Sequence, residues 1–116
     1  MYYVSTKVHF DAAHHLVGYK GNCGRCHGHR WEVECLVYGD KLKNGILVDF
    51  KDIKKKLNPI LKKLDHHDLN KVVKFNPTAE NLAKYIFDKM WPLVCQVKVW
   101  ESPDSFAAYG ADDVIE

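Results

Sequence analysis

The chain lacks any run of about 18 apolar residues, the length that a membrane-spanning helix requires. It also lacks an excess of one charge, because 17 basic and 15 acidic side chains leave a formal net charge of only +2. This balance argues against the strongly basic surface that nucleic-acid-binding domains present to phosphates. A leader-like segment, internal repeats and low-complexity stretches are also missing. These absences predict a cytoplasmic protein with no membrane partner and no nucleic-acid partner.

Cysteine is scarce too, with four residues among 116. A chain that is 47% hydrophobic can bury a sizeable core and does not need disulfides to fold. Cys35 and Cys95 lie among apolar residues and are predicted to belong to that core. Cys23 and Cys26 form a close pair, which in a reducing compartment is more typical of metal binding or catalysis. We therefore expect residues 1–116 to form a single domain.

Strand signals occur toward both ends of the chain. Apolar side chains recur at every second position in residues 2–10 and, more cleanly, in residues 29–38. Residues 46–48 follow a polar, turn-rich stretch and are predicted to return as a short strand. Residues 95–99 alternate in the same way, and residues 106–109 form a last short strand. The pattern predicts two strands or more before the centre of the chain and two after it.

Two helices are predicted between these strands. Asp49 can cap the first helix, and Pro59 is expected to kink or split it. The second helix opens with Thr78 as its cap or Pro77 at its first position, and Pro92 ends it. Strands on both sides of a helix pair predict an α+β fold, in which an antiparallel sheet carries helices on one face.

Three histidines share the apolar sides of two predicted strands. His27 and His29 are two residues apart, so that in an extended chain both imidazoles point to the same side. His14 continues the parity of Phe10 on the first strand, provided that no bulge intervenes. Three neutral imidazoles around one Zn²⁺ leave a fourth position open, which is the arrangement of a catalytic zinc site. The sequence therefore predicts a zinc-dependent enzyme.

Glu101 shares its parity with the apolar residues Val97 and Val99. A carboxylate on the apolar side of a strand is costly unless it is paired or hydrogen-bonded. Two interpretations stay open. Glu101 is either a surface residue at a frayed strand end or a ligand anchor, whose two oxygens accept parallel N–H bonds from a planar heterocycle.

A second polar cluster, Asp65-His66-His67-Asp68, follows the first predicted helix. An aspartate beside a histidine can orient the imidazole and stabilise its protonated form, which makes an acid–base unit. The alternative is an ordinary polar helix terminus, with histidine near the negative end of the helix dipole. The sequence pattern by itself leaves both possibilities open.

The cysteine pair raises an alternative for the metal. Cys23, Cys26, His27 and His29 have the ligand count of a structural Cys2His2 zinc site. All four fall within seven positions, however, which is far tighter than the spacing of zinc fingers. A non-catalytic, zinc-stabilised module is therefore the second class of function, and it does not require the Asp65–His66 pair.

Six segments of the chain, in this order and at these spacings, match a known family. They are Phe10-Asp11-Ala12-Ala13-His14, Cys23-Gly24-Arg25-Cys26-His27-Gly28-His29, Gly45-Ile46-Leu47-Val48-Asp49-Phe50, Leu64-Asp65-His66-His67-Asp68-Leu69-Asn70, Asn76-Pro77-Thr78-Ala79-Glu80 and the late Glu101. Over nearly its full length the chain resembles the family of 6-pyruvoyl tetrahydropterin synthase and 6-carboxytetrahydropterin synthase. The resemblance implies the tunnelling fold, or T-fold: a four-stranded antiparallel sheet with two helices on one face.

The resemblance also implies an assembly and a set of site residues. Three subunits would join their sheets into a barrel, and two such rings would stack into a hexamer with active sites between subunits. The resemblance implies zinc binding for His14, His27 and His29, and it implies that Glu101 anchors the pterin. It implies catalysis for Cys23, as general base or nucleophile-like thiolate, and for Asp65 with His66, as an acid–base pair. Thr78, at the start of the second predicted helix, is expected separately to line the substrate pocket or the subunit contact.

The implied substrate is 7,8-dihydroneopterin triphosphate. The first choice of product is 6-carboxy-5,6,7,8-tetrahydropterin, formed with loss of triphosphate and acetaldehyde. This product would be a precursor of deazaguanine nucleosides such as queuosine. The alternative is 6-pyruvoyl tetrahydropterin synthase, which eliminates triphosphate only. A small, lysine-rich chain with one glutamine favours the 6-carboxy branch. Cys26, His15 and Arg30 depart from the family pattern at or beside the expected zinc ligands.

Overall fold

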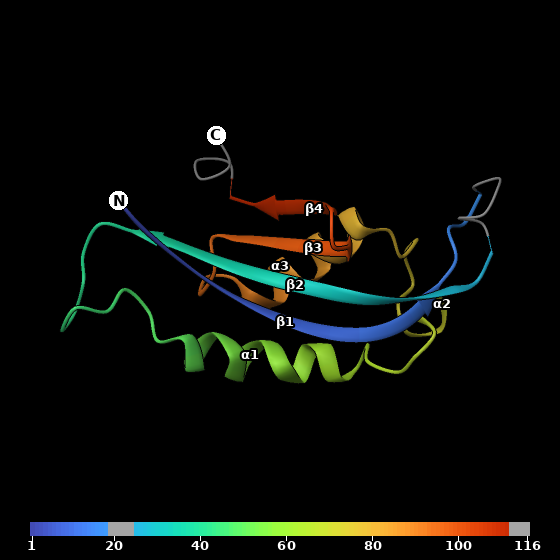
Figure 1. The fold of residues 1–116 in the computed structure, drawn as a ribbon, viewed down its shortest axis with the longest axis horizontal. Helices are drawn as coiled ribbons and strands as arrows, with labels where there is room; N and C mark the ends of the chain where they lie inside the picture. The colour runs from blue at the N-terminus through green and yellow to red at the C-terminus, as the bar shows by residue number, and fades with distance from the viewer. Residues whose placement is uncertain (19–24, 112–116) are drawn as a thin grey trace.

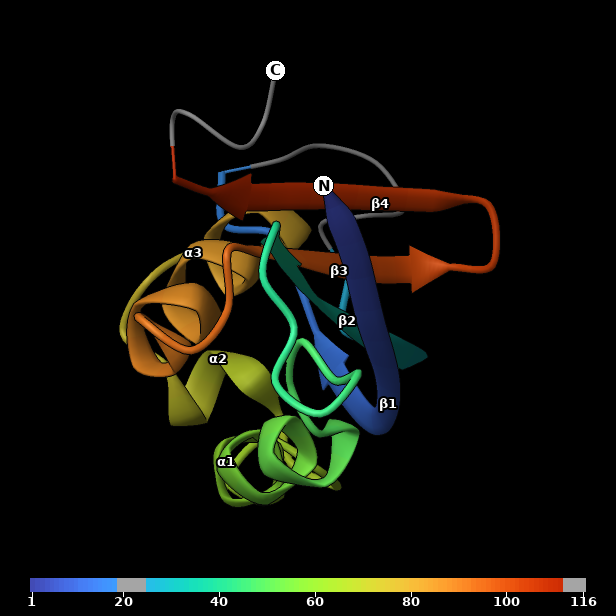
Figure 2. The same cartoon turned by 90° about the vertical axis from the view of Figure 1, so that its left-hand side faces the viewer.

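Four antiparallel strands form one sheet, and the helices pack on one of its faces (Figures 1 and 2). The computed structural model describes residues 1–18 and 25–111. The strands follow the order β1-β2-β3-β4 across the sheet. Along the chain the elements are β1 (Tyr2–His14), β2 (His27–Gly39), α1 (Phe50–Lys62), α2 (Leu69–Val72), α3 (Ala79–Met90), β3 (Gln96–Ser102) and β4 (Ser105–Gly110).

The two longest strands build a ribbon that runs the length of the molecule (Figure 1). β1 and β2 have 13 residues each and pair in unbroken register from Tyr2 opposite Gly39 to His14 opposite His27. Both strands are longer than the alternation predicted, because polar residues at their ends continue the pairing. The parity predicted for His14 required that no bulge interrupt the first strand, and β1 pairs without a bulge as far as His14.

The core lies between the sheet and the helices. The odd-numbered face of β2 is buried, with Trp31, Val33 and Cys35 fully inaccessible to solvent, and Val97 and Val99 extend this face onto β3. The helices cover it with their apolar stripes, whose buried members are Ile53, Leu57 and Leu61 of α1 and Ala79, Leu82, Ala83, Ile86, Phe87 and Met90 of α3. The predicted α+β architecture is confirmed, and Cys35 is a core residue as expected.

Side-chain caps fix where the helices begin. The carboxylate of Asp49 accepts a hydrogen bond from Lys51 N (2.9 Å) at the start of α1, and the Thr78 hydroxyl accepts one from Asn81 N (3.1 Å) at the start of α3. Each satisfies one backbone donor that the first helical turn leaves without a partner. Among the described residues, no helix combines the length and the hydropathy that crossing a membrane would take.

The predicted strand at residues 46–48 is wrong. Lys43 and Ile46 exchange two backbone hydrogen bonds (2.9 and 3.0 Å) across Asn44 and Gly45, whose φ angles are +53° and +78°. Two successive positive φ values define the tight turn that Asn-Gly favours. The pairing stops at this single bridge, because three residues later Asp49 already caps α1.

The sequence predicts that Pro59 kinks or splits the first helix. The split is wrong, since α1 runs from Phe50 to Lys62 with Pro59 inside it, and the kink stays a prediction. Proline removes one backbone donor in a helix. Pro59 is exposed, so water can satisfy the acceptor that loses its partner. α2, a single turn capped by Asp68, is an additional helix that the sequence pattern did not predict.

The packing of α1 generates the first prediction. Leu57 is fully buried between α1 and the sheet, and Leu57→Ala should lower the free energy of unfolding by ~2–5 kcal/mol through lost apolar contacts and a residual cavity. Urea denaturation measures the change. The matched control is Lys54→Ala on the exposed side of the same helix, expected within about 0.5 kcal/mol of the parent. A loss for Leu57→Ala no larger than that of the control would contradict this packing.

Candidate metal centre

The register of the long ribbon brings the three predicted zinc-binding histidines to one place. His14 is directly opposite His27, and His29 lies opposite Ala12, two residues back along β1. Directly opposed residues and residues two apart share one face of a sheet, so all three imidazoles project from the same side. Ring centroids are 4.7 Å apart for His14 and His27, 5.1 Å for His14 and His29, and 4.5 Å for His27 and His29.

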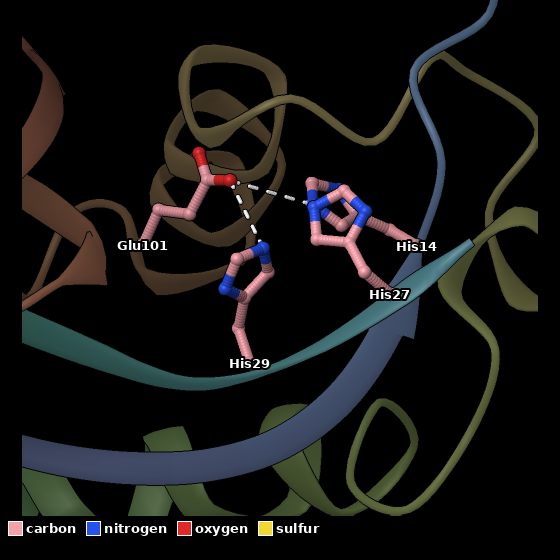
Figure 3. A group of neighbouring side chains, drawn as sticks. All are labelled: His14, His27, His29 and Glu101. Atoms are coloured by element: carbon pink, nitrogen blue, oxygen red, sulfur yellow. Dashed lines mark ion pairs between the residues drawn. The ribbon is translucent and has the colours of Figure 1, made fainter. Parts of the chain in front are cut away.

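Glu101 reaches the same place from β3 (Figure 3). β2 and β3 pair with Val33 opposite Val99, and this register, continued by two residues, places Glu101 opposite Trp31 on the face that carries the histidines. The four side chains, His14, His27, His29 and Glu101, each offer one ligand atom, and these atoms all lie within 4.8 Å of one another. We call this group the His3Glu cluster.

Backbone carbonyls set the tautomers of two of the histidines. Nδ1 of His14 lies 2.8 Å from the carbonyl oxygen of Pro77, and Nδ1 of His27 lies against the carbonyl oxygen of Arg25. A carbonyl oxygen only accepts hydrogen bonds, so each Nδ1 carries the proton and donates it. Each Nε2 is then left with a free lone pair, which is the usual arrangement of a metal-binding histidine.

The ligand set fits a metal ion. Nε2 of His14 and Nε2 of His29 are buried and have no hydrogen-bond partner. A buried polar atom without a partner costs free energy, and a bound cation would remove the cost. Burial is also the main cause that lowers the pKa of His29, opposed by the negative charge of Glu101 and aided by the other two histidines. The neutral imidazole, which is the form that binds metal, is therefore favoured.

His15 and Cys26, which could compete for the metal, do not belong to the His3Glu cluster. His15, beside His14, is engaged with Asn70: its backbone N donates to Asn70 Oδ1 (2.9 Å), and its Nε2 lies 3.3 Å from Asn70 Nδ2. Cys26 is exposed and belongs to neither group of potential metal ligands. Cys23, the predicted catalytic thiol, lies outside the described residues, so its role stays a prediction.

Asp65 and His66 lie close to each other, but they lie beside the edge of β1 and not at the His3Glu cluster. The carboxylate of Asp65 accepts a hydrogen bond from Asp11 N (2.9 Å), and His66 N donates to the carbonyl oxygen of Asp11. Ala13 N continues the contact by donating to the carbonyl oxygen of His67 (3.2 Å). The segment therefore pairs with the free edge of β1, and neither sequence-based interpretation anticipated this edge contact.

The side chains of this second cluster involve two residues that the sequence interpretation missed. His66 Nε2 lies 3.4 Å from Asp65 Oδ2, and the Asp11 carboxylate belongs to the same group. Arg30, directly opposite Asp11 in the ribbon, donates to Asp11 Oδ1 (3.1 Å) and lowers the pKa of that carboxyl. The signal in the sequence was a pair of opposite charges at facing positions of two strands.

The two clusters lie on different sides of the ribbon. Asp11 alternates with the buried residues Phe10 and Ala12, so its side chain projects away from the face that carries His14. His66 is 79% exposed. One chain by itself therefore presents the predicted acid–base pair to solvent, away from the His3Glu cluster.

A small cavity borders Glu101. It has a volume of about 200 Å³, and Glu80, Glu101, Ser105 and Phe106 are among its lining residues. Complete pockets for small molecules usually measure ~300–1,000 Å³, so this cavity is smaller than a typical ligand pocket. Thr78 does not line the cavity and instead caps α3, and its proposed contact with substrate stays a prediction.

Together, the sheet order, the helices on one face and the histidine group define the class as an α+β protein of the T-fold with a candidate metal centre. The family model described as 6-pyruvoyl tetrahydropterin synthase matches residues 3–112, and the chain belongs to this family. The resemblance stated from the sequence motifs is thereby confirmed, and with it the expectation of a pterin synthase type of enzyme.

Relatives agree with this assignment. A protein of Archaeoglobus fulgidus named putative 6-carboxy-5,6,7,8-tetrahydropterin synthase is 36% identical over 107 residues, covering 90% of this chain and 91% of the relative. A dihydroneopterin monophosphate aldolase of Pyrococcus furiosus is 37% identical over 84 residues, covering 72% and 70%. The solved structure of 6-pyruvoyl tetrahydropterin synthase from Caenorhabditis elegans superposes with a TM-score of 0.83, at 25% identity and 95% coverage of each chain.

The geometry of the cluster predicts that His14→Ala strongly reduces metal binding. One divalent ion per chain is expected in the parent protein after incubation with Zn²⁺ and dialysis, and the variant should retain much less, because one of three nitrogen ligands is gone. Elemental analysis measures the metal-to-protein ratio.

The matched control is His15→Ala, which removes the adjacent histidine and should keep one ion per chain. Cys26→Ser should also keep it. Metal loss in Cys26→Ser together with metal retention in His14→Ala would contradict a histidine-based centre and favour the cysteine-containing alternative.

Proposed function

We propose that the protein is a zinc-dependent lyase that converts 7,8-dihydroneopterin triphosphate and one water molecule to 6-carboxy-5,6,7,8-tetrahydropterin, triphosphate and acetaldehyde. The observation that carries the proposal is the convergence of His14, His27 and His29 in a chain whose family match spans residues 3–112. The relative from Archaeoglobus fulgidus supports the 6-carboxy branch, since it is named a putative 6-carboxy-5,6,7,8-tetrahydropterin synthase and its match covers 90% of this chain.

Zinc is the proposed metal because three imidazoles with an open or exchangeable fourth position are typical of catalytic zinc. When bound, Zn²⁺ would act as a Lewis acid that lowers the pKa of a hydroxyl on the substrate side chain. The chain supplies the orientation of the ligands. The carbonyl groups of Pro77 and Arg25 hold the imidazoles of His14 and His27 in the tautomer that leaves Nε2 free.

Proton transfer is assigned to Cys23, Asp65 and His66. Asp65 is held at one oxygen by the backbone N of Asp11, which leaves its other oxygen, Oδ2, facing His66 Nε2. A carboxylate fixed in this way orients the imidazole and stabilises its protonated form. Cys23, as thiolate, would take a proton from the substrate side chain, and a nearby cation would lower the pKa of its thiol enough to act near neutral pH.

A catalytic role for His66 favours assembly of several chains. Within one chain His66 faces solvent on the side of the ribbon away from the His3Glu cluster, so a complete site would combine clusters from neighbouring subunits. β4 supports this, because among the described residues it has a partner on one side only, and an unpaired edge can pair with another chain. We propose a hexamer built as a dimer of trimers.

Glu101 is the proposed pterin anchor. Glu101 lines the 200 Å³ cavity together with Glu80, Ser105 and Phe106. The 2-amino group and the ring N–H of a pterin present two donors side by side, and a carboxylate can accept both. Thr78 caps the helix that carries Glu80 and is proposed to help shape this end of the cavity.

Two other reactions stay as alternatives. The structure from Caenorhabditis elegans carries the name 6-pyruvoyl tetrahydropterin synthase, which favours elimination of triphosphate alone. The relative from Pyrococcus furiosus is named an aldolase for dihydroneopterin monophosphate, which favours a phosphate monoester as substrate. All three reactions start from a dihydroneopterin phosphate, and they differ in product.

Product identification separates these reactions. The purified, zinc-loaded protein is incubated with 7,8-dihydroneopterin triphosphate and, separately, with the monophosphate, and the products are identified by mass spectrometry. The proposal expects 6-carboxytetrahydropterin and acetaldehyde from the triphosphate. A pyruvoyl product would establish the 6-pyruvoyl tetrahydropterin synthase reaction. Cleavage of the monophosphate alone would establish the aldolase reaction. If metal-loaded protein converts neither compound, the non-catalytic zinc-stabilised module is favoured.

The assignment of proton transfer predicts that Cys23→Ala and His66→Ala each reduce kcat by ~10²–10⁴-fold, the usual contribution of a general acid or base. Zinc content and oligomeric state should not change. Cys26→Ser is the matched control for the thiol and should keep most of the activity. Full activity of Cys23→Ala would place the base elsewhere, with Asp65 and His66 as the next candidates.

The anchor role predicts that Glu101→Gln weakens binding of 7,8-dihydroneopterin by ~1–3 kcal/mol, because a donor replaces one acceptor oxygen and faces another donor. Calorimetry measures the dissociation constant. Glu34→Gln, on the opposite face of the sheet, is the matched control and should bind as the parent does. If Glu101→Gln binds 7,8-dihydroneopterin with unchanged affinity, the alternative interpretation of Glu101 as a surface residue is favoured.

A further inference from the structure

Glu101 has a second feature that the pterin-anchor role does not use. Its Oε1 atom lies 3.1 Å from Nε2 of His29 and 3.5 Å from Nε2 of His14 (Figure 3). Both nitrogens are buried and lack a hydrogen-bond partner, although this oxygen is close to them. The carboxylate therefore approaches the two nitrogens without forming the hydrogen bonds that would explain its position.

The spacing matches two corners of a metal coordination sphere. Zinc bonds to histidine nitrogen and carboxylate oxygen are about 2.0–2.2 Å long, and a tetrahedron with such bonds has ligand atoms about 3.3–3.5 Å apart. The two Glu101 distances, 3.1 and 3.5 Å, lie close to this range. The third nitrogen ligand, from His27, also lies within 4.8 Å of the other ligand atoms.

The position of Glu101 between two environments adds a second argument. Glu101 belongs to the His3Glu cluster through its carboxylate, and the same residue also lines the 200 Å³ cavity. In Figure 3 one oxygen faces the histidines and the other points away from them. With 35% of its side chain exposed, Glu101 is less tightly enclosed than His14, so it has more room to move.

We propose that Glu101 is the fourth protein ligand of the metal ion in the substrate-free protein, and that it leaves the metal when a pterin enters the cavity. The exchange rests on the proposed function. The carboxylate would then accept the two N–H donors of the pterin, and the metal would offer its open position to the substrate side chain. Substrate recognition and opening of the metal are thereby coupled through one side chain.

The metal-binding part is tested without substrate. Zn²⁺ affinity of the parent protein and of Glu101→Gln is measured by competition with a chromophoric chelator. Because loss of even an outer partner of a metal ligand weakens binding about 10–100-fold, Glu101→Gln should bind Zn²⁺ at least ~10-fold more weakly. Glu80→Gln removes the other carboxylate that lines the cavity and should leave Zn²⁺ affinity unchanged.

The exchange is followed with Co²⁺ in place of Zn²⁺, since the visible spectrum of Co²⁺ reports the number and type of its ligands. The spectrum of Glu101→Gln should differ from that of the parent before any pterin is added. Saturation with 7,8-dihydroneopterin should change the parent spectrum, whereas that of Glu101→Gln should change little. Circular dichroism and thermal unfolding establish that both variants are folded.

Equal Zn²⁺ affinity and equal Co²⁺ spectra of the parent and Glu101→Gln would overturn the ligand role. A parent spectrum that does not change while calorimetry shows bound pterin would overturn the exchange. Failure of the proposed function is distinguishable, because a protein that neither binds nor turns over pterins would still show the Glu101-dependent Zn²⁺ affinity if the ligand role is correct.

Discussion

The pairing register of β1 and β2 is the constraint on which the site depends. Because His14 is directly opposite His27, and His29 follows two residues later on the same face, the ribbon itself assembles three imidazoles. A slip of one residue would turn the histidines of one strand to the other face of the sheet and separate the ligands. The register is held by the buried alternation of Phe10, Trp31 and Val33, whose packing against the helices would be lost with the same slip.

The ends of the helices complete what the ribbon begins. The carbonyl group of Pro77, just before the cap of α3, orients His14, and the residues that follow α1 pair with the edge of β1 at Asp11 and Ala13. Both contacts use backbone groups, so the chain path rather than a particular side chain provides them. The helices therefore bury the core and also place polar groups around the open end of the ribbon.

Much of this could be predicted from the sequence, because most elements carry a local signal. Period-2 alternation located three of the four strands, and the caps at Asp49 and Thr78 located two helix starts. The spacing of His27 and His29 indicated a shared metal. The errors were local as well. The strand expected at residues 46–48 failed because the turn at Asn44 and Gly45 permits only one bridge before the next cap, and the break expected at Pro59 failed because its neighbourhood is open to water.

The sequence by itself determined which side chains can do chemistry and on which face of their strands they lie, since both follow from residue type and a period of two. Only the tertiary structure decided which of them meet. Glu101 is 72 residues from His29 in the sequence, and pairing of β3 with β2 sets its carboxylate 3.1 Å from that imidazole. The same structure separates Asp65 and His66 from the His3Glu cluster and sets them beside Asp11 and Arg30. Contacts of this kind depend on strand order and register, which no local pattern of residues encodes.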